Sequence, residues 1–299
     1  MTRTIHDAKS LTISFLTPVS FASLNGSDKE ADNISSIKKI TVGTEEYPYV
    51  SSQALRRALR NQLAVLGWEL SEGVAATIMK GAATTKQKPA EYIDDDLFGY
   101  MGTESANESK KGKATKRTSV VRVCPLISLD MYQGDLDFGT NYMSVQAGGN
   151  PNIFETEIHS GMYRGTLLIE LDRVGCGDGF EKELAPAEKA KRVKALLQAL
   201  KNLWGSGRQS RLLADISPKF IAAAFTTAKN PIFLESLRVK NGAVQTEMLE
   251  EVLSDYDAEV IAAVFGERKG MFSSEYAKAK TIGEAFTELE QLVDKYYTS

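Results

Sequence analysis

Alternating apolar and polar positions predict the strands of this chain. Residues 11–21 place apolar side chains on every second position around Ile13 and Phe15, and residues 163–174 do the same around Leu167. This period of two is typical of a strand with one buried face. Shorter apolar runs predict further strands, and these cover residues 120–129, 220–228 and 232–239.

Apolar residues that recur every three or four positions predict helices. The predicted helices cover residues 54–66, 73–80, 187–204, 246–265 and 282–297. The first has the clearest start signal, because Ser51, Ser52 and Gln53 stand immediately before its apolar face. Such residues cap helix N-termini by accepting bonds from backbone N–H groups.

Two long polar segments interrupt this pattern. Residues 102–119 are almost without apolar side chains, a composition that predicts a mobile basic loop. Residues 133–157 are rich in Gly and Asn with Phe138, Tyr142 and Met143 interspersed, which predicts a long protruding hairpin. Because no linker divides the chain, we expect a single α+β sheet core with protrusions over residues 1–299.

Composition places the chain among globular proteins. It has 299 residues, 42% apolar and 25% charged, with 36 Lys and Arg against 39 Asp and Glu and a formal net charge of −3. No apolar run approaches the roughly 18–20 residues of a membrane span. The first residues lack the pattern of a signal peptide. We therefore expect a cytoplasmic protein with no membrane partner.

Scarce residue types argue against several chemistries. Cys124 and Cys176 lack partners at metal-ligand spacing, so neither a zinc site nor a disulfide framework is expected. His6 and His159 stand in no recognisable catalytic motif, and His159 is interpreted as a polar strand or loop residue. Residues 94–96, all Asp, are interpreted as an acidic turn near a helix start rather than a magnesium site. We expect no cofactor and no metal.

Charge is unevenly distributed along the chain. Residues 38–67 hold five basic and two acidic side chains, 103–124 six and two, and 201–219 four and one, whereas 236–299 hold seven and twelve. A basic groove can bind nucleic acid within an acidic protein, because affinity depends on local neutralisation of phosphates. Ordinary solvated surfaces would give similar clusters, so charge alone leaves both interpretations open.

The start of the first predicted helix is suited to phosphate binding. Its sequence is Ser51-Ser52-Gln53-Ala54-Leu55-Arg56-Arg57-Ala58-Leu59-Arg60. Hydroxyl and amide groups at a helix N-terminus add neutral donors to the unpaired backbone N–H groups there. Arg56 and Arg60 stand four positions apart on one helix face and could follow a sugar–phosphate backbone.

This stretch resembles the S-S-Q-x-x-[KR]-R-x-x-R helix of the Cascade backbone subunit, CRISPR-associated protein seven, in its DevR-like type I-B branch. The sequence Asp96-Leu97-Phe98-Gly99-Tyr100-Met101 is similar to the family's D-L-F-G-x-M. Residues 126–138 and 157–164 resemble later family segments, the second of them S-G-x-[FY]-Y-R. The ordered set spans most of residues 10–240.

The resemblance implies an RRM-like (ferredoxin-like) palm with finger and thumb insertions. The finger corresponds to residues 84–119 and the thumb hairpin to 134–157, while 241–299 are expected to be acidic C-terminal helices. Copies would assemble as a helical filament along one CRISPR RNA without catalysing a reaction. Because the basic-aromatic RRM motif that stacks bases is missing, recognition would follow the RNA backbone, and guide pairing would read the target DNA.

The resemblance also implies partners and site residues. Partners would be CRISPR RNA, the target DNA strand, further copies of the chain, the 5′-handle-capping subunit, the large subunit and the 3′-end processing endonuclease. Guide-RNA contacts would be Ser51, Gln53, Arg56, Arg57 and Arg60, supplemented by Lys38, Lys39, Arg208 and Arg211. The apolar thumb wedge would be Phe138 and Met143. Finger contacts to target DNA or a neighbouring copy would be Lys110, Lys111, Lys113, Lys116 and Arg117.

Two other functions remain open at this stage. Related filament subunits of type III systems cut target RNA with a loop aspartate and a metal ion, and Asp28, in the predicted loop after the first strand, is the residue to consider. The naming of the DevR branch suggests a stand-alone transcriptional regulator. No helix-turn-helix or dimer-forming heptad in the sequence supports that function.

Overall fold

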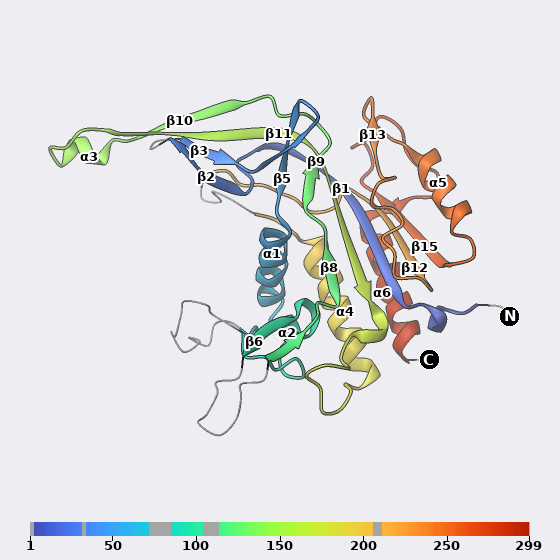
Figure 1. The fold of residues 1–299 in the computed structure, drawn as a ribbon. Coiled ribbons are helices and arrows are strands. Elements are labelled where there is room, and N and C mark those ends of the chain that lie inside the picture. Colours follow the sequence, from blue (N-terminus) through green and yellow to red (C-terminus); the bar gives the residue numbers. More distant parts are fainter. Residues whose placement is uncertain (1–2, 32–33, 72–84, 104–113, 206–210, 299) are drawn as a thin grey trace, which may run out of the picture.

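A large, mostly antiparallel sheet forms the centre of the molecule (Figure 1). The computed structural model describes residues 3–31, 34–71, 85–103, 114–205 and 211–298. The central strands lie in the order β12 (Phe220–Thr226), β1 (Ser10–Ala22), β11 (Asn152–Glu170) and β9 (Leu126–Ser128). Each neighbouring pair of these strands is antiparallel, which confirms the predicted α+β class.

Shorter strands extend the sheet on both sides. Beyond β12 lie β15 (Val260–Glu267) and β16 (Lys280–Thr281). Beyond β9 lie β5 (Glu45–Val50) and β4 (Lys39–Val42), and β8 (Val121–Val123) pairs with β11. The predicted strand over 120–129 is therefore two short strands, each paired with a different part of the long β11.

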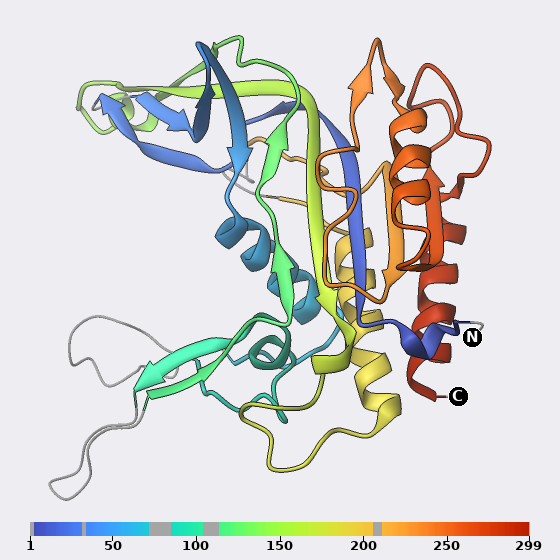
Figure 2. The ribbon, with the colours of Figure 1, turned by 45° about the vertical axis from the view of Figure 1, so that its right-hand side comes forward.

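Helices cover one face of the sheet. They are α1 (Ser52–Val65), α4 (Pro186–Lys201) and α6 (Ile282–Thr298). Ile13 and Phe15 of β1 point toward them and are buried with Leu59, Leu196 and Phe286 in one apolar core. Figure 2 shows these helices behind the sheet. The alternation in residues 11–21 therefore sets which side chains meet the helices.

The opposite face is covered over β12 and β1 by C-terminal elements. These are α5 (Thr246–Asp255), β13 (Val239–Lys240) and β14 (Ala243–Val244). Leu16 and Phe220 are buried there against Phe233, Leu249 and Phe265 in a second core. Figure 2 shows α5 in front of the sheet. This part of the sheet is therefore enclosed between two layers.

Two predicted elements are wrong in the C-terminal third. Residues 246–265 are not one helix, because the helix ends at Asp255 and Val260–Glu267 form strand β15, which pairs with β12. Of the predicted strand over 232–239, residues 232–236 form turns and only Val239 belongs to a strand, β13, although Phe233 and Leu237 are buried. A short apolar run fits a strand or a buried helix equally well, and the available pairing edge decides. The segment 241–299 therefore contains a core strand as well as acidic helices.

The connections between the central strands follow a regular order. In chain order the elements are β1, α1, β9, β11, α4 and β12. Each helix thus connects two strands of the same sheet and packs on the same face of it. The predicted helix over 73–80 lies outside the described residues.

A long hairpin leaves the sheet at its upper edge in Figure 1. It consists of β10 (Asp135–Asn141), the short helix α3 (Met143–Gln146) and the first part of β11. β11 runs without interruption for 19 residues, so that one strand belongs to both the hairpin and the core sheet. Midway along it, β2 (Gly26–Ala31) and β3 (Ile34–Ile37) join the hairpin, with β3 paired to β11 at Glu155 and Thr156.

A buried ionic network joins the lower elements of the molecule. Asp96, in α2 (Ile93–Phe98), places its two carboxylate oxygens 2.5 Å from Arg117 Nη2 and 2.8 Å from Arg192 Nη1. The Gly175 N–H donates to the same carboxylate at 3.1 Å. Removing one partner from a buried charge network leaves an uncompensated charge in a low-dielectric interior. Asp96 therefore holds three segments to one another.

Arg117 is placed wrongly by the sequence prediction. It ends strand β7 (Ala114–Arg117), which pairs with β6 (Tyr100–Thr103), and it is 2% exposed. Besides Asp96 it donates to the backbone carbonyls of Arg173, Cys176 and Asp178 at 2.8–3.0 Å. With its guanidinium enclosed in this way, Arg117 is not a contact for DNA or for a neighbouring copy. Asp94 and Asp95 are buried too, and with Asp96 they stand in the first turn of α2, at the helix start that the sequence predicts for them.

Asp96→Asn should lower the free energy of unfolding by about 3–5 kcal/mol, since two buried arginines lose their counter-charge. Chemical denaturation measures this change. Asp257→Asn, on an exposed aspartate, is the matched control and should change stability by no more than about 0.5 kcal/mol. Equal effects of the two substitutions would contradict the role given to Asp96.

A second carboxylate should make stability depend on pH. Burial raises the pKa of Glu170, but hydrogen bonds from Arg122, Lys229 and Arg173 outweigh burial and lower the pKa from 4.5 to about 2. The unfolded chain therefore binds this proton more tightly, and the stability contributed by Glu170 should be lost as pH falls from 4.5 toward 2. Glu170→Gln should flatten the unfolding free energy against pH in this range. Glu251→Gln, on an exposed glutamate, should not flatten it.

Candidate nucleic-acid interface

Helix α1 begins with an ordered cap. The Ser51 Oγ accepts a hydrogen bond from the Ala54 N–H at 3.3 Å, and the Ser51 N–H donates to Asn25 Oδ1 at 2.7 Å. A hydroxyl that accepts such a bond keeps its own hydrogen as a donor. One turn of helix separates Gln53 from Arg57, and both side chains are exposed. The cap therefore presents a hydroxyl, an amide and a cation near the helix N-terminus.

Arg56 and Arg60 face the interior side of the same helix. Arg56 donates to the Phe98 carbonyl and to Ser119 Oγ, the latter at 3.0 Å. Arg60 Nε lies 3.4 Å from Asp94 Oδ2 and its guanidinium stacks 4.6 Å from the centre of the Phe98 ring. Burial lowers the pKa of both arginines. These contacts fasten α1 to α2, so the two predicted phosphate ligands are engaged within the protein.

The predicted lysine contacts lie beside the base of the hairpin. Lys39 places Nζ 3.1 Å from Glu157 Oε1 and 4.3 Å from the centre of the Tyr132 ring, and its side chain is 14% exposed. Lys38 lies between β3 and β4 and is half-buried. The main role visible for Lys39 is therefore to connect β4 with β11.

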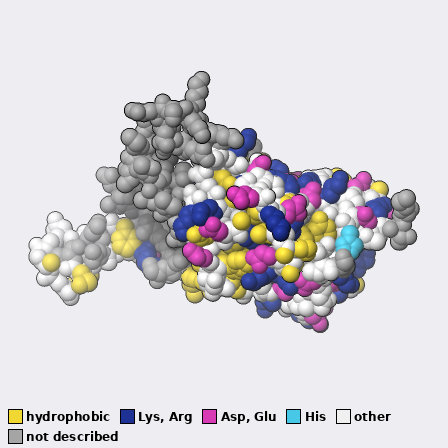
Figure 3. All heavy atoms as spheres, turned by 90° about the horizontal axis from the view of Figure 1, so that it is seen from below, with side chains coloured by type: hydrophobic (Ala, Val, Ile, Leu, Met, Phe, Trp, Pro, Cys, Tyr) yellow, Lys and Arg dark blue, Asp and Glu magenta, His cyan; other side chains and the backbone are white. Residues whose placement is uncertain are grey.

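Apolar side chains are exposed along the hairpin. Phe138 on β10 is 62% exposed and Met143 at the tip is 75% exposed. Leu136, Tyr142 and Ile153 are also exposed. Figure 3 shows hydrophobic side chains on the protruding hairpin, away from the body, where Lys and Arg intermingle with Asp and Glu. Several large apolar side chains exposed on one protrusion are typical of a surface that binds a partner.

Arg211 packs on the hairpin from the neighbouring segment. Its Nη2 donates to Thr156 Oγ1 at 2.9 Å and lies 3.6 Å from Asp137 Oδ2, and its guanidinium stacks 4.7 Å from the centre of the Phe154 ring. The Phe154 ring covers Gly139, where a Cβ atom would clash with it. Arg211 thus supports the face of the hairpin opposite to Phe138. Arg208 lies outside the described residues.

Only part of the predicted finger is described. Lys116 lies on β7 with an exposed side chain, while Lys110, Lys111 and Lys113 lie outside the described residues. The backbone of Asp28 belongs to strand β2, so this aspartate is not in the loop that the sequence predicts. Among the residues that the structure describes, no group of three His, Cys, Asp or Glu side chains is arranged to hold a metal ion.

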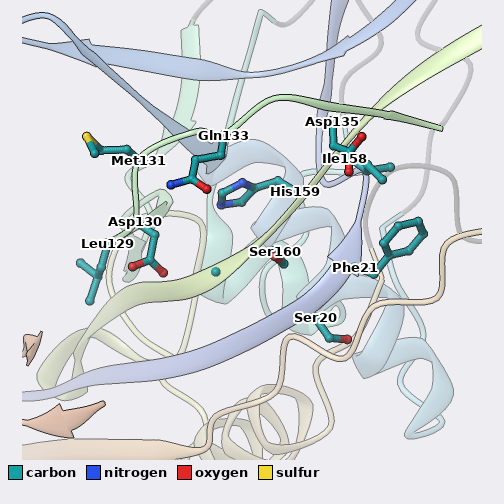
Figure 4. A pocket seen from close by; sticks show the side chains of 11 residues that line it. Ser20, Phe21, Leu129, Asp130, Met131, Gln133, Asp135, Ile158, His159 and Ser160 are labelled. Atoms are coloured by element: carbon teal, nitrogen blue, oxygen red, sulfur yellow. The ribbon is translucent and has the colours of Figure 1, made fainter. Parts of the chain in front are cut away.

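A cavity of about 750 Å³ opens where the hairpin leaves the sheet (Figure 4). Its lining comes from the end of β1, the loop before β10 and the middle of β11. His159, interpreted from the sequence as a polar strand or loop residue, is part of this lining. His159 is 7% exposed, and burial lowers the pKa of its imidazole.

The family described as CRISPR-associated negative auto-regulator DevR/Csa2 matches residues 13–247. The chain belongs to the DevR/Csa2 family. The DevR-like resemblance predicted from the motifs is confirmed, and the match covers both the start of α1 and the hairpin.

One protein sequence and two chains of solved structures are similar to this DevR/Csa2 family member. A protein of Myxococcus xanthus (strain DK1622), described as CRISPR-associated protein Cas7/Cst2/DevR, is 28% identical over 247 residues, which cover 78% of each chain. A chain in a solved CRISPR RNA-guided surveillance complex, pre-nicking, matches with a TM-score of 0.62 at 14% identity, covering 96% of this chain and 100% of the other. A chain in another such complex gives 0.57 at 15% identity, covering 94% and 98%. Because both solved chains are only 14–15% identical to this chain, their likeness shows a shared fold.

The D-L-F-G motif of this family member has a structural role. Asp96 binds the two buried arginines, and the Phe98 ring lies beneath Arg56 and Arg60. Gly99 adopts a φ of +67°, and a Cβ atom there would clash with the Arg117 carbonyl oxygen. Only glycine fits a left-handed backbone with so close a neighbour. None of the described helices is long and apolar enough to cross a membrane.

Proposed function

We propose that this chain is a non-catalytic CRISPR RNA-binding backbone subunit of a type I Cascade complex. The observation that carries the proposal is the protruding hairpin with exposed apolar side chains, beside a capped helix that presents Ser51, Gln53 and Arg57, in a member of the DevR/Csa2 family. Several copies would bind along one guide RNA and present it for pairing with target DNA. The likeness to chains of RNA-guided surveillance complexes supports this arrangement.

In this proposal the core is an RRM-like, ferredoxin-like palm. The succession β1, α1, β9, β11, α4, β12 and the order β12–β1–β11–β9 support it, since they correspond to a β-α-β-β-α-β unit. The face on which ordinary RRM domains stack bases is covered over β12 and β1 by the second core. RNA would therefore bind at the helix start and hairpin, through its backbone. Such binding accepts any guide sequence.

The contacts of each side chain refine the predicted RNA ligands. Ser51, Gln53 and Arg57 would bind guide phosphates, since Ser51 caps the N-terminus of α1 and the side chains of Gln53 and Arg57 beside it are exposed. Arg56 and Arg60 would fix the direction of α1, because Phe98 and Asp94 engage them. The supplementary contacts would be Lys38, Lys39, Arg208 and Arg211.

The hairpin and finger would contact other macromolecules. The thumb hairpin, residues 134–157, would insert Phe138 and Met143 as an apolar wedge that separates stacked bases. Lys116, with Lys110, Lys111 and Lys113, would reach target DNA or a neighbouring copy. The remaining partners would be the 5′-handle-capping subunit, the large subunit and the 3′-end processing endonuclease.

Target-RNA cleavage is the alternative function, and a direct assay distinguishes it. A guide-loaded complex would be incubated with labelled complementary RNA and Mg²⁺. Regularly spaced cuts that Asp28→Ala abolishes would overturn the non-catalytic proposal. Intact RNA under conditions where a type III complex cuts its target would support the proposal.

Arg57→Ala should weaken guide-RNA binding equally for unrelated guide sequences and reduce the slope of log affinity against log salt by about one. Its unfolding free energy should change by no more than about 0.5 kcal/mol, because the side chain is exposed. Fluorescence anisotropy with two guide RNAs measures the affinity. Lys240→Ala removes an exposed cation from β13 and is the control. Equal losses in both variants would contradict the assignment.

A further inference from the structure

Asn25 joins two segments that the proposed function assigns to guide RNA. Its Oδ1 accepts a hydrogen bond from the Ser51 N–H at 2.7 Å, and its backbone carbonyl accepts one from the Lys38 N–H at 3.0 Å. Ser51 caps α1, and Lys38 precedes β4. A single residue of the loop after β1 therefore holds the start of α1 and the lysine segment in a fixed relation.

The backbone of Asn25 adopts a conformation that few residues tolerate. Its φ is +39°, in the left-handed region. Glycine enters this region freely, and asparagine and aspartate enter it more readily than most other residues. Glycine has no side-chain acceptor for the Ser51 N–H. Asparagine supplies that acceptor without the negative charge that aspartate would place near a guide phosphate.

The loop that carries Asn25 is anchored on both sides. Leu24, immediately before it, is buried in the core between the sheet and the helices. Gly26, immediately after it, pairs with Ile37, and the Ile37 N–H donates to Glu157 Oε2 on β11 at 2.8 Å. The α1 cap is therefore connected through Asn25 to the sheet core and to the hairpin.

The bond from Ser51 to Asn25 determines how the cap is oriented. The Ser51 Oγ also accepts from the Ala54 N–H at 3.3 Å, so this residue is held both at its backbone N–H and at its hydroxyl oxygen. Its hydroxyl hydrogen remains as a donor for a phosphate oxygen. Without the Asn25 acceptor, the Ser51 N–H would lose one of the two bonds that fix the cap.

We propose that Asn25 is a positioning residue of the guide-phosphate site at the start of α1. It acts through Ser51 and makes no contact with RNA itself. The proposal rests on the function proposed above and adds a residue that lies outside the helix motif, 26 positions before Ser51.

Asn25→Gly removes the acceptor and keeps the backbone conformation, because glycine adopts a positive φ without strain. Fluorescence anisotropy with the full chain and a guide RNA should show affinity reduced about three- to tenfold. Asn241→Gly is the matched control, since Asn241 also precedes a glycine, has a φ of +52° and is exposed in the turn between β13 and β14. The control should keep its affinity within about twofold.

A Ser51→Ala background distinguishes positioning from a general effect on the fold. Once the Ser51 hydroxyl is removed, Asn25→Gly should reduce affinity by less than about twofold, because the group that Asn25 orients is gone. An equal loss of affinity with and without the Ser51 hydroxyl would overturn the proposal. Unchanged affinity of Asn25→Gly in the otherwise wild-type chain would overturn it as well.

Hydrogen exchange in the native state tests the bond directly. In Asn25→Gly the Ser51 amide should exchange faster, while the Leu59 amide in the middle of α1 should exchange as in the wild-type chain. Asn25→Asp keeps an acceptor and tolerates the left-handed backbone, so the Ser51 amide should stay protected. Loss of that protection in Asn25→Asp would contradict the role of the acceptor, including in the case that Asn25→Gly does not fold.

The outcomes separate the two proposals. Absence of guide-RNA binding by the wild-type chain would refute the proposed function, and with it the site that Asn25 positions. Guide binding that Asn25→Gly leaves unchanged, or weakens equally in the Ser51→Ala background, would refute only the role of Asn25.

Discussion

The carboxylate of Asp96 is the interaction on which the lower half of the molecule depends. It binds arginines from β7 and α4 and a backbone N–H from the segment after β11, so four separate parts of the chain meet at one buried charge. Each arginine donates further bonds to backbone carbonyls, which satisfies the groups that burial would otherwise leave unpaired. The position of α2 follows from this network.

That position determines how α1 is turned. Phe98, two residues after Asp96, lies beneath both Arg56 and Arg60, and Asp94 pairs with Arg60. With these guanidinium groups held against α2, the opposite side of the helix start presents Gln53 and Arg57 to solvent. The five phosphate ligands that the motif predicts thus divide into two groups: Arg56 and Arg60 orient the helix, and the others remain near its N-terminus.

The continuity of β11 connects the core to the hairpin. Its C-terminal half pairs with β1 in the enclosed sheet, and its N-terminal half pairs with β10 in the protruding hairpin. A strand that passes through both parts gives the exposed Phe138 a fixed relation to the sheet. The cavity lies at the transition, where pairing with β1 becomes irregular and the loop before β10 contributes to the lining.

The sequence by itself determined the first strand, the helices α1, α4 and α6, the protruding hairpin and the family, because periodicity, caps and ordered motifs are local signals. Only the tertiary structure decided that residues 260–267 join β12 as a strand, that Arg117 is buried, and that Arg56 and Arg60 face Phe98. Pairing edges and counter-charges come from residues distant in sequence. The cavity around His159 could not be predicted either, since its lining joins three separated segments.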